Sequence, residues 1–533
     1  RVIKEEIEKS ITEALISLGI ETGEFVVEHP TDLKMGDYST NVGIKTGKAK
    51  EIFNHLAVKP PSGVERIELA GPGFINFHLS KEFFKNSLKE IIDNEKDFGK
   101  SEHAKGFKVL MEYTSPNLFK PLHIGNLVGN ITGESLARIF ESSGAEVRRI
   151  NYPSDIGLTV AKAVWGLKKT QNDPEDIKAL GDAYRSGNES YENDPAAKEE
   201  IEQINRALYE NSDPELTALK DKGIRTSLRH LDSICERFGT RFDKVFFESQ
   251  SAPIGQEIVK NHIGEVFEVS EGATVFHGGH TRVFLNSQGL PTYEAKELGL
   301  FKLKIEEFPD FNMSITVTGT EQKDFFKIVF EAIKKVFPNE TKGKILKHIA
   351  NSFLRLSTGK MSSRKGNTIS GEDLVEEVKT RVKGDEQVAI GAIKYMILRQ
   401  TIGHDIIFDF EKSVSTEGDS GVYLQYAYAR TNSLLKKADI KPDPKGEREN
   451  THEIEKLLYR FPEIVERAGK EYAPNYITTY LTELSSAFNN FYAHEQVIGD
   501  SSESSYRLAI VKAFNIVIKN GLTILGISTP ESM

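Results

Sequence analysis

Two short segments of this chain combine residue types that can bind and polarise phosphate groups. The first, SPNLFKPLHIGN from Ser115 to Asn126, lies between a predicted strand and a predicted helix. A helix N-terminus at a strand end offers free N–H groups to an anion. Within the segment, Gly125 allows close approach to the backbone, and His123 can donate hydrogen bonds to phosphate oxygens as charge builds in a transition state. Taken alone, His-x-Gly-Asn is equally compatible with a chance tetrapeptide.

The second segment is GKMSSRKGN, from Gly359 to Asn367. Its three cations, two hydroxyls and flanking glycines are suited to clamping a triphosphate. The residues of interest are Lys360, Met361, Ser362, Ser363 and Arg364. An exposed nucleic-acid-binding loop or a linker would show the same composition.

Charge distribution is more informative than the net charge of −10, which by itself argues mildly against a nucleic-acid partner. From Thr341 to Ser370 there are seven basic residues and no acidic one. From Gln171 to Lys220 there are thirteen acidic residues and five basic ones. An acidic protein can still bind RNA when its basic groups gather where phosphates lie.

Composition also bounds the class of protein. A chain of 533 residues with 38% hydrophobic residues predicts two to four globular domains. The single cysteine, Cys235, excludes an intrachain disulfide and a cysteine-based metal cluster. The sequence contains no run of about 18 apolar residues, so it predicts no membrane span. The charged first residues do not resemble a signal peptide. We therefore expect a cytoplasmic protein without a membrane association or a protein-bound structural metal.

The elements that must position these segments follow from hydrophobic periodicity. Apolar residues spaced by three and four, beginning at Ile3, predict an N-terminal amphipathic helix, followed by strands, in a small α+β domain over 1–100. A βαβ unit is predicted from the strand FKVLMEY, a helix from Leu127 to Ser142 that ends at Gly144, and the strand EVRRINY. Residues 101–405 should therefore contain a parallel sheet. The acidic stretch near 168–219 predicts a helical insertion. Helical periodicity over 406–533 predicts a C-terminal bundle.

The two segments together resemble the paired signatures of class I aminoacyl-tRNA synthetases. Their neighbours resemble arginyl-tRNA synthetases in particular: NLVGNITGESLARIFESSGAEVRRINYPSDIG, AGPGFINFHL, GVYLQYAYAR and NGLTILGISTPESM. The resemblance covers most of the chain except the acidic insertion. It implies a Rossmann-type parallel-sheet catalytic core with a helical insertion, an N-terminal tRNA-binding α+β domain and an all-α anticodon-binding bundle.

The resemblance also implies roles in binding ATP. His123 and Gly125 match the first signature, while Asn126 replaces the usual second histidine. Lys360, Met361, Ser362, Ser363 and Arg364 match the second signature, with Ser363 in place of a catalytic lysine. Arginyl enzymes often lack that lysine, and Lys120 stands where a substituting lysine is expected. Lys120, His123 and Lys360 are therefore the predicted catalytic residues.

Recognition of arginine requires carboxylates for the guanidinium group and amide or hydroxyl groups for its other polar atoms. By resemblance the pocket contains Glu112, Asn117, Tyr293, Glu297 and Gln322. The family usually has aspartate at position 297, so the extra methylene of glutamate shifts the charge by about 1.5 Å.

For tRNA, the resemblance implies anticodon contacts from Tyr423, Gln425, Tyr426 and Arg430, and a tail ending at Met533 near the anticodon. Aromatic rings and donors suit unstacked bases, although helical spacing places some of these side chains in the core. The implied reaction activates arginine with ATP, accompanied by Mg²⁺, and transfers it to the terminal 2′-OH of tRNA(Arg). The enzyme is expected to be a monomer.

Three alternatives remain open from the sequence. One is a class I synthetase for another amino acid, and a second is a catalytically silent tRNA-binding paralogue, suggested by Asn126, Ser363 and Glu297. The third is a nucleotidyltransferase with a His-x-Gly signature, which would not need two RNA-binding domains.

Overall fold

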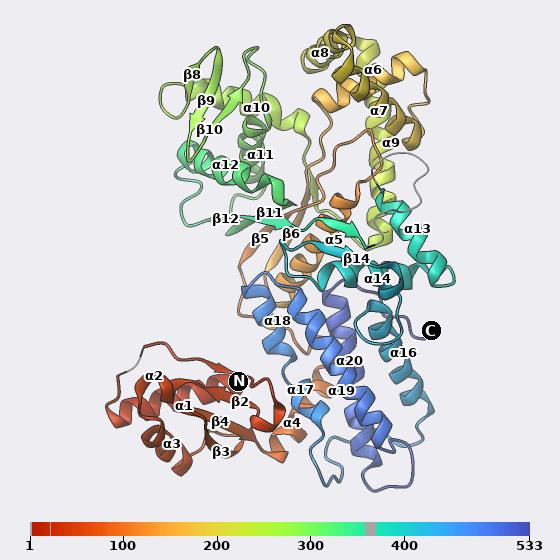
Figure 1. Cartoon of the computed structure of the whole chain (residues 1–533). Helices are drawn as coiled ribbons and strands as arrows, with labels where there is room; N and C mark the ends of the chain where they lie inside the picture. Colours follow the sequence, from red (N-terminus) through yellow and green to blue (C-terminus); the bar gives the residue numbers. More distant parts are fainter. Residues whose placement is uncertain (1–2, 22, 358–368) are drawn as a thin grey trace.

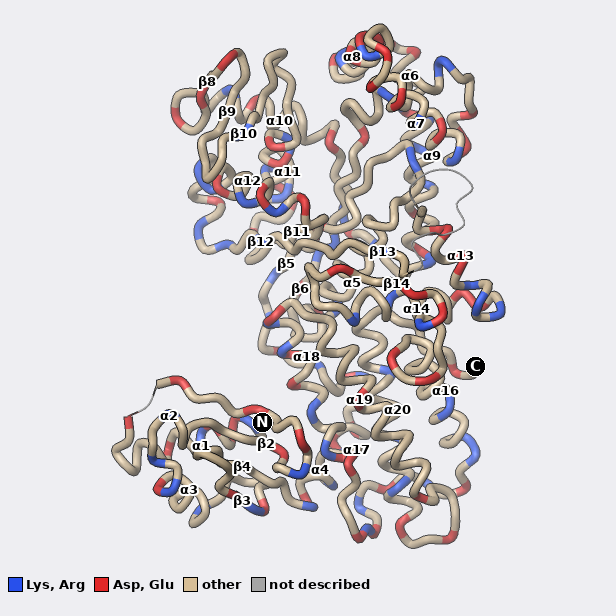
Figure 2. The backbone as a smooth tube through the Cα atoms, in the orientation of Figure 1, with Lys and Arg blue, Asp and Glu red and all other residues tan. Residues whose placement is uncertain are grey.

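The computed structural model describes residues 3–21, 23–357 and 369–533. It contains an N-terminal α+β domain, a central parallel sheet flanked by two lobes, and a C-terminal helical bundle (Figure 1). Lysine and arginine residues are interspersed with acidic residues over most of the chain (Figure 2). None of the described helices is both long and apolar enough to cross a membrane.

The N-terminal domain packs helices on an antiparallel sheet of order β1-β2-β4-β3. Its strands are β1 (Val27–Glu28), β2 (Tyr38–Thr40), β3 (Val64–Ala70) and β4 (Phe74–Leu79). Its helices are α1 (Ile3–Leu18), α2 (Val42–Thr46), α3 (Ala49–Val58) and α4 (Lys81–Asn94), with the 3-10 turns η1 (Leu33–Met35) and η2 (Glu95–Asp97). The apolar residues of α1 that recur at spacings of three and four are all buried, as predicted for an amphipathic helix.

The central sheet is wholly parallel and has the order β12-β11-β5-β6-β7. Its strands are β5 (Lys108–Glu112), β6 (Glu146–Asn151), β7 (Lys244–Val245), β11 (Met313–Gly319) and β12 (Ile345–Asn351). The helix α5 (Ile124–Ser142) connects β5 to β6, and Gly144 follows it with φ 89°. The strand order reverses between β5 and β11, which is where such sheets bind ligands.

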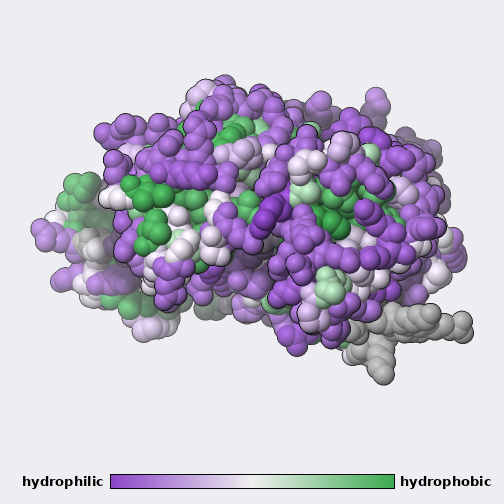
Figure 3. Space-filling model, turned by 90° about the horizontal axis from the view of Figure 1, so that it is seen from above, coloured by the Kyte–Doolittle hydropathy of each residue, from purple (hydrophilic) through white to green (hydrophobic). Residues whose placement is uncertain are grey.

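Two lobes stand above the sheet, and Figure 3 looks down on them onto a mostly hydrophilic face. The first lobe is helical, made of α6 (Leu158–Thr170), α7 (Ile177–Asn193), α8 (Pro195–Glu210) and α9 (Pro214–Phe238). The acidic insertion predicted near 168–219 is thus part of a longer helical stretch. The second lobe carries an antiparallel sheet of order β10-β9-β8 that the sequence did not reveal. It consists of α10 (Glu248–Asn261), β8 (Glu268–Ser270), β9 (Ala273–His277), β10 (Thr281–Leu285), α11 (Tyr293–Glu307), the 3-10 turn η3 (Thr320–Gln322) and α12 (Lys323–Val336).

The rest of the chain descends from the sheet into the bundle (Figure 1). The connecting elements are β13 (Leu354–Leu356), α13 (Gly371–Arg381), α14 (Glu386–Leu398), β14 (Ile406–Phe408) and α15 (Phe410–Ser413). The bundle helices are α16 (Gly421–Lys437), α17 (Glu453–Leu458), α18 (Phe461–Lys470), α19 (Asn475–His494) and α20 (Ser504–Ile524). Residues of α5 and α9 join the buried residues of the bundle in one continuous core, which ties the sheet to the bundle.

The N-terminal domain also rests on the bundle. Tyr459, at the end of α17, is buried in the apolar core of the N-terminal domain. Glu463 of α18 accepts hydrogen bonds from the Tyr38 hydroxyl and from His29, whose Nε2 lies 3.0 Å away. The predicted fold class, a parallel-sheet core between an α+β domain and a helical bundle, is confirmed.

Candidate active site

The loop after β5 is held in an unusual backbone conformation. Thr114 and Ser115 have φ values of 77° and 36°, in the left-handed region that residues with a side chain rarely adopt. The Ser115 amide donates to Oδ1 of Asn151 at 3.0 Å, and the side-chain amide of Asn126 donates to the Thr114 carbonyl at 3.1 Å. Such strain persists only where surrounding contacts enforce it, and it is common at functional sites.

His123 is the N-cap of α5, so it stands where the helix presents its free N–H groups. Its Nδ1 accepts a hydrogen bond from the Gly125 amide at 3.0 Å, so the ring proton is on Nε2 in the neutral form. Burial and the nearby Lys120 charge lower the pKa of His123. A Cβ at Gly125 would lie 3.1 Å from Nδ1, which explains the glycine. The arrangement directs one N–H donor of a neutral imidazole away from the helix.

Lys120 lies beside this donor. Its pKa is lowered by burial, and its amine lies 4.9 Å from the ring centre of Tyr184 in the helical lobe. The amide of Asn126, which replaces the second histidine of the signature, braces the strained loop through the Thr114 carbonyl. Asn126 thus has a structural partner within the loop that carries Lys120 and His123.

The second signature lies outside the described residues. This applies to Lys360, Met361, Ser362, Ser363 and Arg364. Two residues beyond the gap, Ser370 forms an antiparallel bridge with His123, and the Gly371 amide donates to the Leu122 carbonyl at 2.9 Å. The chain that follows the second signature is therefore anchored beside the first one.

A cluster of carboxylates occupies the end of the sheet near the reversal of strand order. Glu112 is 2% exposed, and its carboxylate accepts a hydrogen bond from the Lys304 amine at 2.5 Å. Glu297, one turn along α11 from Tyr293, has no hydrogen bond or ion pair within the described part of the chain. Burial and the charge of Glu112 raise the pKa of Glu297 well above its ordinary value, against the opposing effect of Lys304. Only when Glu297 ionises do the two carboxylates and one ammonium leave one negative charge without a partner.

A second pair beside this cluster is already neutral. Glu248, at the start of α10, accepts hydrogen bonds from the Lys296 amine at 2.9 Å and the Ser154 hydroxyl at 2.8 Å. Lys296 also lies 4.9 Å from the ring centre of Tyr293. Of the carboxyl groups placed here, Glu297 is therefore the one available to a further cation.

The other residues predicted to bind arginine are exposed. Tyr293 is 55% exposed and begins α11, whose preceding residue Thr292 is its N-cap. Asn117 is exposed and bridges to Ser154, and Gln322 is exposed in the turn after β11. The strands that end at Glu112 and Gly319 are hydrogen-bonded neighbours. The structure thus brings residues from four separate segments to one edge of the sheet.

Most residues predicted to contact RNA share a second site, on the bundle. Tyr423, Tyr426 and Arg430 line a pocket of 290 Å³ together with Asn489. Gln425 does not face this pocket, because it is fully buried and its amide donates to the Ser528 carbonyl at 2.9 Å. Met533, at the end of the tail, is 50% exposed.

Some basic side chains between Thr341 and Ser370 are engaged in contacts within the protein. The Lys344 amine donates to the carbonyls of Pro309 and Phe311, and Arg355 pairs with Asp405 at 3.2 Å. The stretch is therefore not a uniform phosphate-binding surface.

Three charged residues beside Glu297 were not predicted from the sequence. Lys304 follows Glu297 by seven residues, which places both on one face of α11, and this spacing was a usable signal. Glu248 and Lys296 pair across two helices, and their spacing in the sequence gives no indication of that contact.

Comparison with known proteins agrees with this arrangement. Residues 2–79 match the arginyl tRNA synthetase N terminal domain, residues 87–410 the catalytic domain of tRNA synthetases class I (R), and residues 424–533 the DALR anticodon binding domain. An arginine–tRNA ligase of Borreliella burgdorferi is 28% identical over 98% of both chains. One of Clostridium acetobutylicum is 29% identical over 100% of this chain and 99% of its own.

Solved structures show the same fold. An arginyl-tRNA synthetase of Plasmodium falciparum superimposes with a TM-score of 0.80 at 21% identity, over 100% of this chain and 98% of its own. That of Thermus thermophilus superimposes with a TM-score of 0.80 at 23% identity, over 99% and 100%. Because the class I catalytic family spans more than half of its length, the chain belongs to the arginyl-tRNA synthetases.

Proposed function

We propose that ATP binds across the N-terminus of α5, with its phosphates at His123 and Gly125. The neutral imidazole of His123 offers its Nε2–H to a phosphate oxygen, and Lys120 supplies positive charge from the same loop. Ser370 pairs with His123, which supports a place for the second signature, including Lys360, over the same phosphates. Met361, Ser362, Ser363 and Arg364 belong to the same proposed ATP site.

We propose that the guanidinium of L-arginine pairs with Glu297. The assignment rests on Glu297 being the carboxyl group without a cationic partner beside the Glu112–Lys304 pair, because one bound guanidinium would neutralise it once it ionises. Glu112 pairs with Lys304, which leaves Glu297 as the carboxylate that can pair with the guanidinium. Tyr293, Asn117 and Gln322, which are exposed, contact the remainder of the substrate.

The proposed reaction has two steps. An oxygen of the arginine carboxylate attacks the α-phosphorus of ATP, forming arginyl-adenylate and breaking the bond to pyrophosphate. His123 and Lys120 stabilise the negative charge that develops on the phosphate oxygens. The terminal 2′-OH of tRNA(Arg) then attacks the activated carbonyl, and AMP leaves. Mg²⁺ is proposed to enter with the phosphates of ATP as part of the substrate.

We propose that the anticodon of tRNA(Arg) binds at the pocket on α16. Tyr426, which is 46% exposed, offers a ring for an unstacked base, and Arg430 offers a fork of donors, while the buried Tyr423 forms the wall of the pocket and accepts a hydrogen bond from Asn489. The N-terminal domain and the tail ending at Met533 would contact other parts of the same RNA. We further propose a cytoplasmic monomer, since one chain carries all these sites, and light scattering during size-exclusion chromatography measures its mass.

The experiment that tests this function is arginine-dependent exchange of pyrophosphate into ATP, with and without tRNA(Arg). L-citrulline is the matched control substrate, because it has nearly the shape of arginine without the positive charge. We expect exchange with arginine and none with citrulline.

Absence of exchange with arginine and cognate tRNA would support a catalytically silent tRNA-binding protein instead. Exchange driven by a different amino acid, or equally by citrulline, would overturn the pairing with Glu297.

A further inference from the structure

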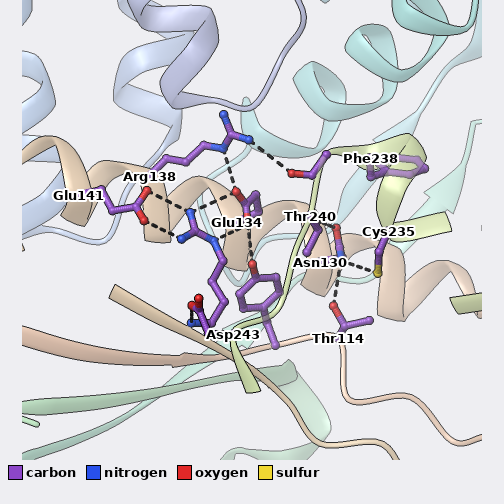
Figure 4. Close-up of polar contacts among 12 residues, drawn as sticks. Thr114, Asn130, Glu134, Arg138, Glu141, Cys235, Phe238, Thr240 and Asp243 are labelled. Carbon is purple, nitrogen blue, oxygen red and sulfur yellow. Dashed lines mark hydrogen bonds and ion pairs between the residues drawn. The ribbon is translucent and has the colours of Figure 1, made fainter. Parts of the chain in front are cut away.

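The loop that carries Lys120 is fixed at its start by buried side chains of the central domain. The Asn130 amide of α5 donates to the Thr114 hydroxyl at 3.0 Å, and the Thr240 hydroxyl donates to Oδ1 of Asn130 at 2.9 Å. Figure 4 shows Asn130 between Thr240 and Thr114. These contacts fix the backbone at Thr114 and leave the position of Lys120 to contacts farther along the loop.

The helical lobe holds the backbone on both sides of Lys120. Phe119 is fully buried with φ 69°, and its amide donates to the Ser227 hydroxyl of α9 at 2.8 Å. On the other side, Pro121 lies against Gly181 of α7, where a Cβ would stand 2.9 Å from Cδ of the proline. Two helices of the lobe therefore enclose the residue between Phe119 and Pro121.

Tyr184, one turn after Gly181 on α7, holds the side chain of Lys120 itself. The Lys120 amine lies 4.9 Å from the centre of the Tyr184 ring, within the range of a cation–π contact. The amine has no hydrogen bond or ion pair with any residue that the structure describes, and burial lowers its pKa. Among the described residues, the aromatic ring is therefore what attracts this cation.

An aromatic ring holds a lysine differently from a carboxylate. A carboxylate neutralises the ammonium charge and occupies its N–H donors, whereas a ring attracts the charge and leaves those donors to a phosphate. Lys162 shows the contrast on the same helix. Its amine lies 4.2 Å from the ring centre of Tyr191, but it also donates to Asn188 at 2.9 Å and lies 3.9 Å from Glu192.

We propose that Tyr184 is a positioning residue that holds the Lys120 ammonium, with its donors unoccupied, toward the phosphates of ATP. The proposal rests on the proposed function, because it deepens the assignment of Lys120 to the ATP site. Tyr184 acts through Lys120 and is not itself a catalytic residue. The acidic helical lobe thereby contributes to the reaction through α7.

The test is pyrophosphate exchange with L-arginine and tRNA(Arg) in variants of Tyr184. Tyr184→Leu removes the aromatic face and keeps an apolar side chain, whereas Tyr184→Phe keeps the face and removes the hydroxyl. We expect kcat of Tyr184→Leu to fall by between about twofold and thirtyfold, which is the range of cation–π attraction converted to a rate. Tyr184→Phe should retain most of the rate. Tyr184→Met removes the same face with a flexible side chain and should reproduce the fall, so the comparison does not depend on one replacement.

Tyr191→Leu is the matched control, since it removes a ring–lysine contact from the same helix at a distance from the loop. It should retain the kcat of the unchanged enzyme. A second measurement places Tyr184→Leu in a Lys120→Met background. With the amine already absent, loss of the ring should cause no further fall in kcat, as expected for two side chains that act as one unit.

A purely structural role of Tyr184 would lower kcat by the same factor with and without the Lys120 amine, which would overturn the proposal. An unchanged kcat in Tyr184→Leu, or equal losses in Tyr184→Phe or Tyr191→Leu, would overturn it as well. Absence of exchange by the unchanged enzyme would instead refute the proposed function.

Discussion

Replacing Glu297 with glutamine tests the charge that the arginine pocket leaves unpaired. Glutamine keeps the shape of the side chain and removes its negative charge. In the free enzyme the substitution removes a carboxyl group whose pKa is raised by burial and by Glu112, so the folded state loses an unfavourable interaction. We therefore expect the melting temperature of Glu297→Gln to stay unchanged or rise.

The effect on the reaction should have the opposite sign. Removing one partner of a buried ion pair costs about 3–5 kcal/mol. Because Glu297 is partly exposed, the lower end of that range applies, and about 3 kcal/mol corresponds to roughly a 100-fold loss in kcat/KM for arginine. The assay is pyrophosphate exchange at varied arginine concentration, with the KM for ATP measured in parallel. We expect the KM for ATP to be unchanged.

Glu294→Gln is the matched control, since Glu294 lies on the first turn of the same helix and is already paired with Arg282 at 3.1 Å. It should retain the kcat/KM for arginine. Equal losses in both variants, or a Glu297→Gln enzyme with unaltered arginine kinetics, would refute the charge argument.

Three further predictions concern the ionisation of Glu297, the hydrogen-bond donor of His123 and the buried amine of Lys394 in α14. Glu297 must ionise to pair with a guanidinium, and its pKa is raised in the empty pocket. The affinity for arginine should therefore increase with pH, and binding should release a proton. Calorimetry in buffers of different ionisation enthalpy measures this proton release. His123→Asn should lower kcat for exchange by about 10²–10³-fold through loss of a transition-state donor, while filter binding shows unchanged affinity for tRNA. Burial and the Arg138 charge lower the pKa of Lys394 from 10.5 to about 7. Between these two pH values the unfolded chain therefore binds more protons than the folded one. The free energy of unfolding should rise with pH over this range, by at most about 1.4 kcal/mol per pH unit. Denaturant titrations should show this rise flattened in Lys394→Met.

Local patterns in the sequence were sufficient to predict the main architecture. The spacing of Ile3, Ile7 and Ile11 predicted α1, and the strand–helix–strand pattern around His123 predicted the parallel sheet. These features depend on residues close together in the chain, where periodicity reports directly on the buried face. The position of His123 at a helix N-terminus followed from the same reasoning.

Features created by distant contacts could not be predicted in this way. The Glu248–Lys296 pair and the burial of Gln425 depend on how helices pack against one another. The neutralisation of Glu112 by Lys304 joins residues 192 positions apart, and it changes which carboxylate can meet a substrate cation. The second signature, including Lys360, lies outside the described residues, so its role remains a prediction.

The most direct test of the arginine site is a crystal structure of the enzyme with L-arginine bound. We expect the guanidinium at hydrogen-bonding distance from the carboxylate of Glu297, with the Glu112–Lys304 pair intact. A guanidinium paired with Glu112 in place of Lys304, or bound away from the carboxyl end of the sheet, would contradict it.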